Sequence, residues 1–137
     1  MNKIKFDSES IKLITFFESM TGAKVKDCIV NDRLIFVVEE NQIAKAIGKN
    51  GINIKRMENA LKRKIKLVEF SNDVLQFVKN ILHPIGMLDV KNEDGVITIY
   101  GKDINAKAML IGRNHTNLDR LTSIVKRYFD VNEIKVR

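Results

Sequence analysis

The chain has 137 residues, of which 45% are hydrophobic and 30% are charged, a composition typical of a soluble globular protein of one ordinary domain or two small ones. No apolar run approaches the roughly 18 residues of a transmembrane helix, and the N-terminus lacks the apolar segment of a secretory signal, so we expect a cytoplasmic protein without membrane contact. The formal net charge of +7 favours a polyanionic partner such as nucleic acid.

The single cysteine, Cys28, excludes a disulfide within the chain and is typical of a reducing compartment. Catalytic thiol chemistry needs a base, and the two histidines, His83 and His115, lie far from Cys28 in the sequence. We therefore expect Cys28 to be a small buried residue of a strand.

The first half of the chain predicts the order helix, strand, strand, helix, helix, strand. Asp7 is the expected N-cap of the first helix and Gly22 its C-terminal stop. Asn31 and Asp32 are the turn residues of a predicted hairpin. The expected ranges are a helix over 7–22, strands over 25–30 and 33–39, a short helix over 41–47, a helix from Gly51 onward and a strand over 65–70.

The second half repeats this order, beginning with a helix that we expect to be capped by Ser71 or Asn72 and to stop near Pro84. The hairpin turn is predicted at 92–95, and Asp103 is expected to start the next helix. The expected ranges are a helix over 71–85, strands over 87–91 and 96–100, a helix over 103–111, a helix through 118–125 and a strand over 132–137.

A shift of 64 residues aligns AKAIGKNGINIKRMENALKR (44–63) with AMLIGRNHTNLDRLTSIVKR (108–127), and eight of the twenty aligned residues are identical. Two copies of one small domain explain this repeat, so we predict a first domain over 1–70 and a second over 71–137. In each half, two helices join the second and third strands, which makes those strands parallel neighbours beside an antiparallel hairpin. The predicted fold class is therefore α/β (α+β): two tandem domains, each a small mixed three-stranded sheet covered by helices on one face.

Basic residues are concentrated in one segment, 45–66, which holds eight lysines and arginines and a single acid, Glu58. A solvated helix face is the simplest explanation for such a run. Here the cations gather around a pair of glycines instead of alternating with acids, which favours a polyanion-binding surface.

The glycine pair, Gly48 and Gly51, lies between two predicted helices and leaves a turn of two residues. Glycine permits the tight reversal, and the absence of a Cβ lets another molecule's backbone approach. The start of the next helix presents N–H groups and a positive dipole end, and Lys49 extends from the tip. All of this suits a phosphodiester backbone. The apolar residues expected to line a narrow groove for unstacked bases are Ile47, Ile52 and Ile54.

The run Ile47-Gly48-Lys49-Asn50-Gly51-Ile52-Asn53-Ile54 has the pattern I-G-x-x-G-x-x-I and resembles the KH family of single-strand nucleic-acid binders. The order of elements is similar to the type II arrangement of that family. Two such domains in one short basic chain resemble the archaeal NusA-like transcription factors.

This resemblance covers nearly the whole chain and implies single-stranded RNA binding in transcription termination or antitermination, with RNA polymerase or other transcription proteins as partners. The polymerase-binding and S1 domains of the bacterial relatives are not recognisable here, so no polymerase contact is carried over to a named residue. The RNA-binding residues implied are Ile47, Gly48, Lys49, Asn50, Gly51, Ile52, Ile54 and Lys55 in the first copy and Gly112, Arg113, Asn114 and His115 in the second.

The second copy departs from the motif because His115 stands where the second glycine is expected. A Cβ there would crowd an approaching phosphate. One hypothesis is a decayed loop with a structural role only. The other keeps Arg113 and Asn114 on phosphates, with His115 adding a hydrogen-bond donor or a stacking face. In either case we expect the first loop to contribute more of the affinity.

Enzymatic functions are not favoured by the sequence. The NTPase loop needs G-x-x-x-x-G-K-[ST], and Gly48 and Gly51 are too close together for it. A dinucleotide fold places its glycines after a strand, whereas Gly48 follows a predicted helix. No acid is spaced with a histidine or another acid as an active site would require, and one cysteine with two histidines does not make up a metal site. We therefore expect a binding protein without cofactor or metal.

Three other binding functions stay open. Two helices joined by a tight turn also suggest a helix-turn-helix DNA binder, although the recurring strands and the glycines at the turn itself argue against it. A scaffold acting through its sheet faces would leave the concentrated charge unexplained. A KH protein of ribosome assembly or translation fits the same residues as a transcription factor. Nothing in the pattern demands self-association, so we expect a monomer.

Overall fold

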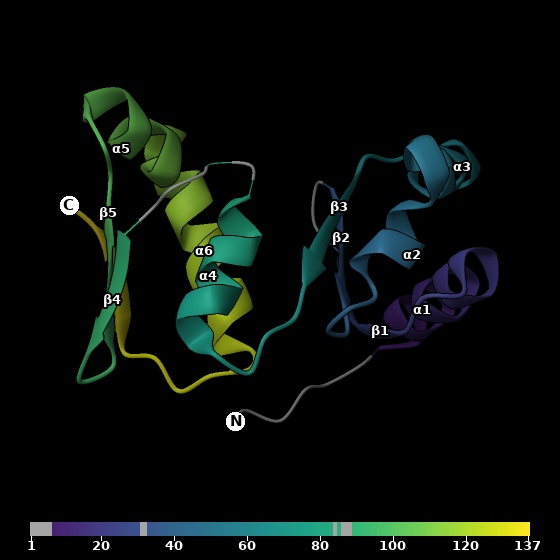
Figure 1. Ribbon diagram of the computed structural model, residues 1–137, viewed down its shortest axis with the longest axis horizontal. Coiled ribbons are helices and arrows are strands. Elements are labelled where there is room, and N and C mark those ends of the chain that lie inside the picture. The colour runs from purple at the N-terminus through teal and green to yellow at the C-terminus, as the bar shows by residue number, and fades with distance from the viewer. Residues whose placement is uncertain (1–6, 31–32, 84, 86–88) are drawn as a thin grey trace. The chain divides into compact units, whose positions relative to one another are not determined.

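The computed structural model describes residues 7–30, 33–83, 85 and 89–137, and these form two compact units that divide between Ser71 and Asn72. Both units follow the predicted order of helix, strand, strand, helix, helix, strand (Figure 1). Each has one small mixed three-stranded sheet. The predicted turn at 31–32, the predicted stop at Pro84 and the predicted strand residues 87–88 lie outside the described residues.

In the first unit, the opening helix begins after Asp7, whose carboxylate accepts a hydrogen bond from the Ser10 amide over 2.8 Å. The helix ends at Gly22, which has a left-handed φ of 73°. Both capping predictions are confirmed. The elements of this unit are α1 (Ser8–Thr21), β1 (Val25–Val30), β2 (Leu34–Val38), α2 (Ile43–Ile47), the 3₁₀ turn η1 (Lys49–Gly51), α3 (Ile52–Leu61) and β3 (Ile65–Glu69).

The sheet of the first unit has the order β1-β2-β3. β1 and β2 are antiparallel, with Val30 opposite Leu34, and β2 and β3 are parallel, with Leu34 opposite Ile65. A parallel pair needs a connection that crosses from one end of the sheet to the other, and α2, η1 and α3 make that crossing. The predicted parallel pairing of the second and third strands is therefore confirmed.

The core of the first unit lies between the sheet and its three helices, which all cover the same face (Figure 1). The middle strand is buried along its whole length, from Leu34 to Val38. Phe36 of β2 stacks on Phe17 of α1 with ring centroids 4.3 Å apart, and Ala46 of α2 and Met57 of α3 are fully buried in the same cluster. This packing holds α2 and α3, and therefore the turn between them, against the sheet.

The second unit differs from its prediction at the start of its first helix and at its hairpin turn. Its first helix begins later, because the N-cap is Asp73, whose carboxylate accepts a hydrogen bond from the Leu75 amide over 3.0 Å, and not Ser71 or Asn72. Asp103 caps the next helix as predicted. The elements of this unit are α4 (Val74–Leu82), β4 (Asp89–Glu93), β5 (Val96–Tyr100), α5 (Ile104–Ile111), the 3₁₀ turn η2 (Arg113–His115), α6 (Thr116–Lys126) and β6 (Glu133–Val136).

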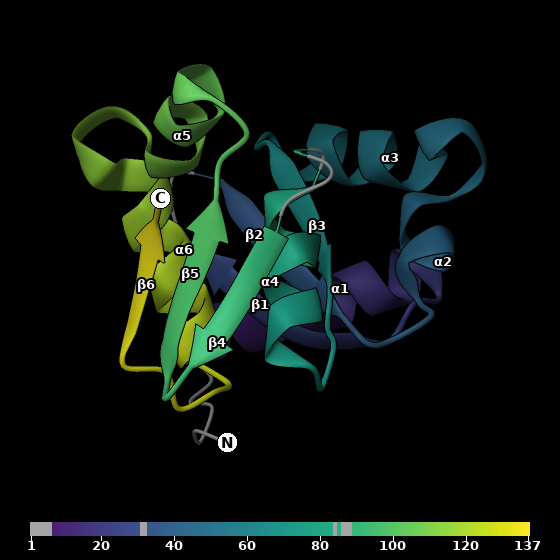
Figure 2. The ribbon, with the colours of Figure 1, turned by 60° about the vertical axis from the view of Figure 1, so that its left-hand side comes forward.

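The second sheet has the order β4-β5-β6, again with one antiparallel and one parallel pairing. Asn92 and Glu93, predicted in the hairpin turn, belong to β4, so Asp94 and Gly95 alone make the turn. Figure 2 shows this sheet in front of α4 and α6. Phe77 of α4 is fully buried and meets Tyr128 edge to face, with ring centroids 5.5 Å apart.

None of the helices in the described ranges is long and apolar enough to cross a membrane.

Cys28 is buried in β1, as predicted, and belongs to the core of the first unit. Burial, together with the neighbouring Asp27 carboxylate, raises the pKa of its thiol from 9.0 to about 12. The thiolate is the form that reacts, so the folded protein should hold about a thousandfold less of it than the unfolded chain at neutral pH.

We therefore expect an alkylating reagent to modify Cys28 slowly in native buffer and rapidly in denaturant, as followed by mass spectrometry at neutral pH. Labelling at equal rates in the two conditions would contradict the burial of this thiol. A Cys28→Ala variant is the control for modification at other residues.

Candidate nucleic-acid interface

The predicted reversal between two helices is the turn η1. Asn50 and Gly51 have left-handed φ angles of 54° and 73°. The Gly51 amide donates to the Gly48 carbonyl over 3.1 Å, and the Ile52 amide donates to the Lys49 carbonyl. The turn thus uses two of its own amides internally, while the side chains of Lys49 and Asn50 are exposed at its tip.

The two glycines of this turn are required for different reasons. Gly48 has φ 75° and ψ 170°, a conformation that is essentially restricted to glycine. A Cβ there would also lie 2.8 Å from Cγ of Asn53. Gly51 has an ordinary left-handed conformation, and a Cβ on it would meet no atom of the protein within 4 Å. A Cβ at Gly51 would therefore crowd only a bound ligand.

Asn53 ties the two helices together across the turn. Its side-chain amide, in the first turn of α3, donates a hydrogen bond to the Lys45 carbonyl in α2 over 2.9 Å. The second unit repeats the bond 64 residues later, where the Asn117 amide donates to the Met109 carbonyl over 2.8 Å. We call this bond the asparagine clamp. It satisfies a carbonyl near the C-terminal end of the preceding helix, where α-helical partners run out.

The second turn, η2, has the same backbone as the first. Gly112 has φ 77° and ψ 169°, Asn114 has φ 55°, and His115 has φ 61° and ψ 18°, close to the values of Gly48, Asn50 and Gly51. Histidine in this region is uncommon but allowed. The hydroxyl of Thr116, where the first copy has Ile52, donates to the Arg113 carbonyl. The motif's departure at His115 has therefore not changed the path of the chain.

The remaining predicted residues surround the first turn with different exposure. Ile47 at the end of α2 and Ile54 in α3 are half-buried, whereas Ile52 is 43% exposed beside the tip. Lys55 is exposed on α3. In the second unit, Arg113, Asn114 and His115 are exposed and Gly112 is half-buried. Each copy thus brings its predicted residues together around one turn; the apolar groove for bases stays a prediction.

Sequence reasoning missed the role of Asn53 and Asn117 in shaping the turns. The signal was present, since both asparagines are among the residues that are identical between the two copies. Both copies also have the first glycine of the pair, whereas the second copy has His115 in place of the second glycine. The glycine and the asparagine occur together because they are in contact. A side chain at Gly48 would displace Asn53, and a side chain at Gly112 would displace Asn117.

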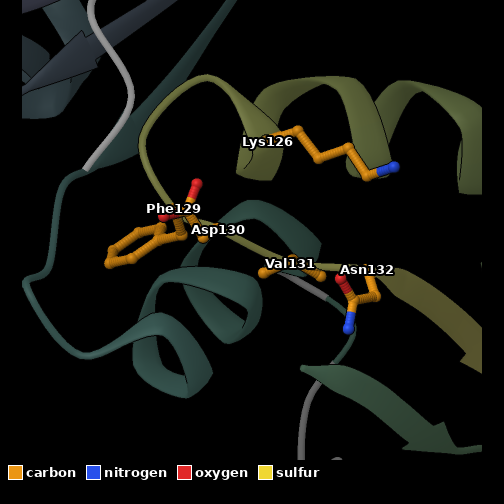
Figure 3. A pocket seen from close by; sticks show the side chains of 5 residues that line it. All are labelled: Lys126, Phe129, Asp130, Val131 and Asn132. Carbon is orange, nitrogen blue, oxygen red and sulfur yellow. The ribbon is translucent and has the colours of Figure 1, made fainter. Parts of the chain in front are cut away.

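A surface hollow of about 330 Å³ lies in the second unit, between the C-terminal end of α6 and the start of β6 (Figure 3). Its lining shares no residue with either turn, and its Asn132 side chain already donates to the Asp94 carbonyl over 3.2 Å. Within the described ranges, no three His, Cys, Asp or Glu side chains are grouped as metal ligands. The lining residues are Lys126, Phe129, Asp130, Val131 and Asn132.

Comparison with known proteins identifies similar sequences and structures over both parts of the chain. The family model described as NusA-like second KH domain matches residues 13–73, which lie almost wholly in the first unit. The chain is 39% identical, over 98% of its length and 80% of the relative's, to the probable transcription termination protein NusA of Methanococcus vannielii. It is 31% identical to the protein of the same name from Thermoplasma acidophilum, over 100% of this chain and 98% of that one. The crystal structure of APE1850 superposes with a TM-score of 0.75 at 30% identity and covers 96% of this chain and 100% of its own.

The asparagine clamp makes a testable contribution to the shape of the first turn. We expect Asn53→Ala to lower the free energy of unfolding by about 1 kcal/mol, because one hydrogen bond is lost and the Lys45 carbonyl loses a partner. Asn53→Asp should cost more, because a carboxylate repels that carbonyl. Denaturant unfolding measures the cost, and amide hydrogen exchange at residues 48–52 should become faster in both variants.

The matched control is Asn117→Asp, which should speed exchange at residues 112–116 and leave residues 48–52 unchanged. Unchanged exchange at the first turn in Asn53→Asp would show that the backbone there is held by other contacts.

Proposed function

Because this chain belongs to the family of archaeal NusA proteins, we propose that it binds single-stranded RNA and acts in transcription termination or antitermination. We propose further that its two units are tandem type II KH domains, over 1–70 and 71–137. The observation that carries the proposal is the exposed Gly48-Lys49-Asn50-Gly51 turn, which lies between two helices in a basic segment and recurs with the same backbone 64 residues later.

The proposed contact is between an RNA phosphate and the tip of the first turn. The N–H groups of Gly51 and Ile52 already donate hydrogen bonds within the turn. A phosphate would therefore bind the backbone N–H groups of Lys49 and Asn50, with the Lys49 ammonium adding charge. The N-terminal end of α3 adds its positive dipole end. Such contacts position the strand without reading its sequence. The exposed side chain of Ile52, next to the tip, is suited to contact a neighbouring base.

The second turn supports a weaker version of the same contact. Arg113 and Asn114 occupy the positions of Lys49 and Asn50, and Asn114 has nearly the backbone angles of Asn50, so they are placed to meet a second stretch of the strand. His115 puts a ring where Gly51 leaves open space, and this ring reduces the room for a phosphate. We propose that the first turn contributes most of the affinity.

The remaining parts of the proposal follow from RNA binding during transcription. The chain acts as a binding protein and not as an enzyme, and it works as a monomer in the cytoplasm. Its protein partners are RNA polymerase or other transcription proteins. Support for this role comes from relatives that carry the name of a probable transcription termination protein and match nearly the whole chain.

The first test is a fluorescence-anisotropy titration of the protein with single-stranded RNA, single-stranded DNA and duplex DNA, each at two salt concentrations. We expect preference for single strands and an affinity that falls steeply with salt. The double variant Lys49→Asp, Asn50→Asp should bind single-stranded RNA about tenfold more weakly or worse, a loss of about 1.4 kcal/mol or more.

The matched variant Arg113→Asp, Asn114→Asp makes the same charge change at the second turn and should have a smaller effect. A larger effect at the second turn would reverse the proposed order of the two loops. Preference for duplex DNA, or binding indifferent to both variants, would reject the single-strand function and favour a helix-turn-helix or a nonspecific basic patch.

An exchange of side chains between the two turns tests the role of open space. Gly51→His should weaken RNA binding, because the new side chain occupies the place where the phosphate approaches. It should also lower the free energy of unfolding by about 1 kcal/mol, because histidine is strained in a left-handed conformation. Unfolding in denaturant and anisotropy titration separate the two effects.

The converse variant, His115→Gly, should raise stability and strengthen RNA binding, because it makes the second turn resemble the first. Weaker binding together with raised stability would show that the His115 ring itself contacts RNA.

A further inference from the structure

The exposed side of α3 next to the first turn carries two cations, Lys55 and Arg56. Lys55 and Arg56 lie three and four residues after Ile52 and four and three residues before Asn59, so these four exposed residues share one side of the helix. Past the end of α3 the exposed cations continue. We call the resulting set the α3 stripe; its members are Lys55, Arg56, Lys62 and Lys64.

The charge of the α3 stripe is not balanced within its own segment. Glu58 is the only acid between residues 45 and 66. Its carboxylate is half-buried and accepts a hydrogen bond from the Ile65 amide over 2.9 Å, at the start of β3. The one negative group of the segment therefore has a structural task at the sheet, and the outer side of the helix keeps its positive charge.

The second unit shows that the fold does not need this charge. At the positions equivalent to Lys55 and Lys64 it has Asp119, which is exposed, and Tyr128, which is fully buried in the core. Only Arg120 and Lys126 retain the charges of Arg56 and Lys62. α6 nevertheless packs in its unit as α3 does in the first. Lys55 and Lys64 are therefore not needed for the fold, and their positive charge is better explained by a ligand.

We propose that the α3 stripe binds phosphates of the RNA beyond the Gly48–Gly51 turn, so that the strand continues along the outer side of α3. This inference rests on the proposed function, because it takes the turn as the place from which the strand leaves. The helix has 10 residues and is about 15 Å long at 1.5 Å per residue. That length accommodates several phosphates at the roughly 3.4 Å spacing of a stacked strand. Lysine and arginine contacts with phosphates add affinity at any sequence.

The test compares Lys55→Glu, Arg56→Glu with the wild type on two RNA lengths by fluorescence anisotropy. One RNA has about four nucleotides, the length that a KH loop holds, and the other is about three times as long. We expect a smaller change on the short RNA than on the long one. On the long RNA the affinity should fall several-fold, and the slope of log affinity against log salt should become shallower by about 1.4, for two lost phosphate contacts at about 0.7 each.

The control is Lys12→Glu, Lys24→Glu, which makes the same change in net charge at two exposed lysines outside the turn and α3. A neutral version, Lys55→Gln, Arg56→Gln, replaces the cations without introducing acids, and thermal unfolding checks that the stripe variants are folded. Equal effects of the stripe and control variants on long RNA would overturn the inference.

The loop variant Lys49→Asp, Asn50→Asp separates the inference from the proposed function. Loss of binding in the loop variant with no effect at the stripe would reject the stripe and leave the proposed function standing. Loss at the stripe with no effect in the loop variant would reject the loop as the binding site, and with it the assumption that the strand leaves from the turn.

Discussion

The candidate interface depends on a stretch of left-handed backbone that neighbouring residues must hold in place. Gly48, Asn50 and Gly51 all have positive φ, and only the two glycines adopt such angles freely. A segment of this kind has little preference for one conformation by itself. The clamp from Asn53 to the Lys45 carbonyl and the packing of α2 and α3 on the sheet supply the missing constraint. The exposure of Lys49 and Asn50 at the tip is a consequence of that constraint.

The two units allow the needs of the fold to be separated from the needs of a ligand. Residues required by the backbone are the same in both, namely the first glycine and the clamping asparagine. Several positions at the surface differ: Gly51 corresponds to His115, Ile52 to Thr116 and Lys55 to Asp119. The same reversal of the chain therefore carries an open, apolar and basic surface in the first unit and a more crowded, polar one in the second.

Much of the fold could be predicted from the sequence because local signals and global topology agree. Apolar periodicity located the helices, Asp7, Gly22 and Asp103 marked helix ends, and the two-helix crossover required parallel β2 and β3. The cap of α4 was predicted wrongly because Ser71, Asn72 and Asp73 are all good caps and only the packing of the helix selects among them. The clamp could not be predicted from spacing alone, because it depends on the angle between two helices. Likewise, the left-handed conformation of His115 is visible only in the backbone, since a histidine in a sequence does not indicate φ.

The position of the turn within the crossover from β2 to β3 also affects how the site is made during folding. β3 pairs with β2 in parallel register only after the chain has reversed through α2, η1 and α3, so closing the sheet and forming the turn belong to one event. The two helices that hold the turn both contact β3, and contacts between segments distant along the chain are slow to form. A nascent chain that has emerged only as far as Gly51 therefore has the residues of the loop but not its geometry, and the binding surface comes into existence when β3 has been synthesised.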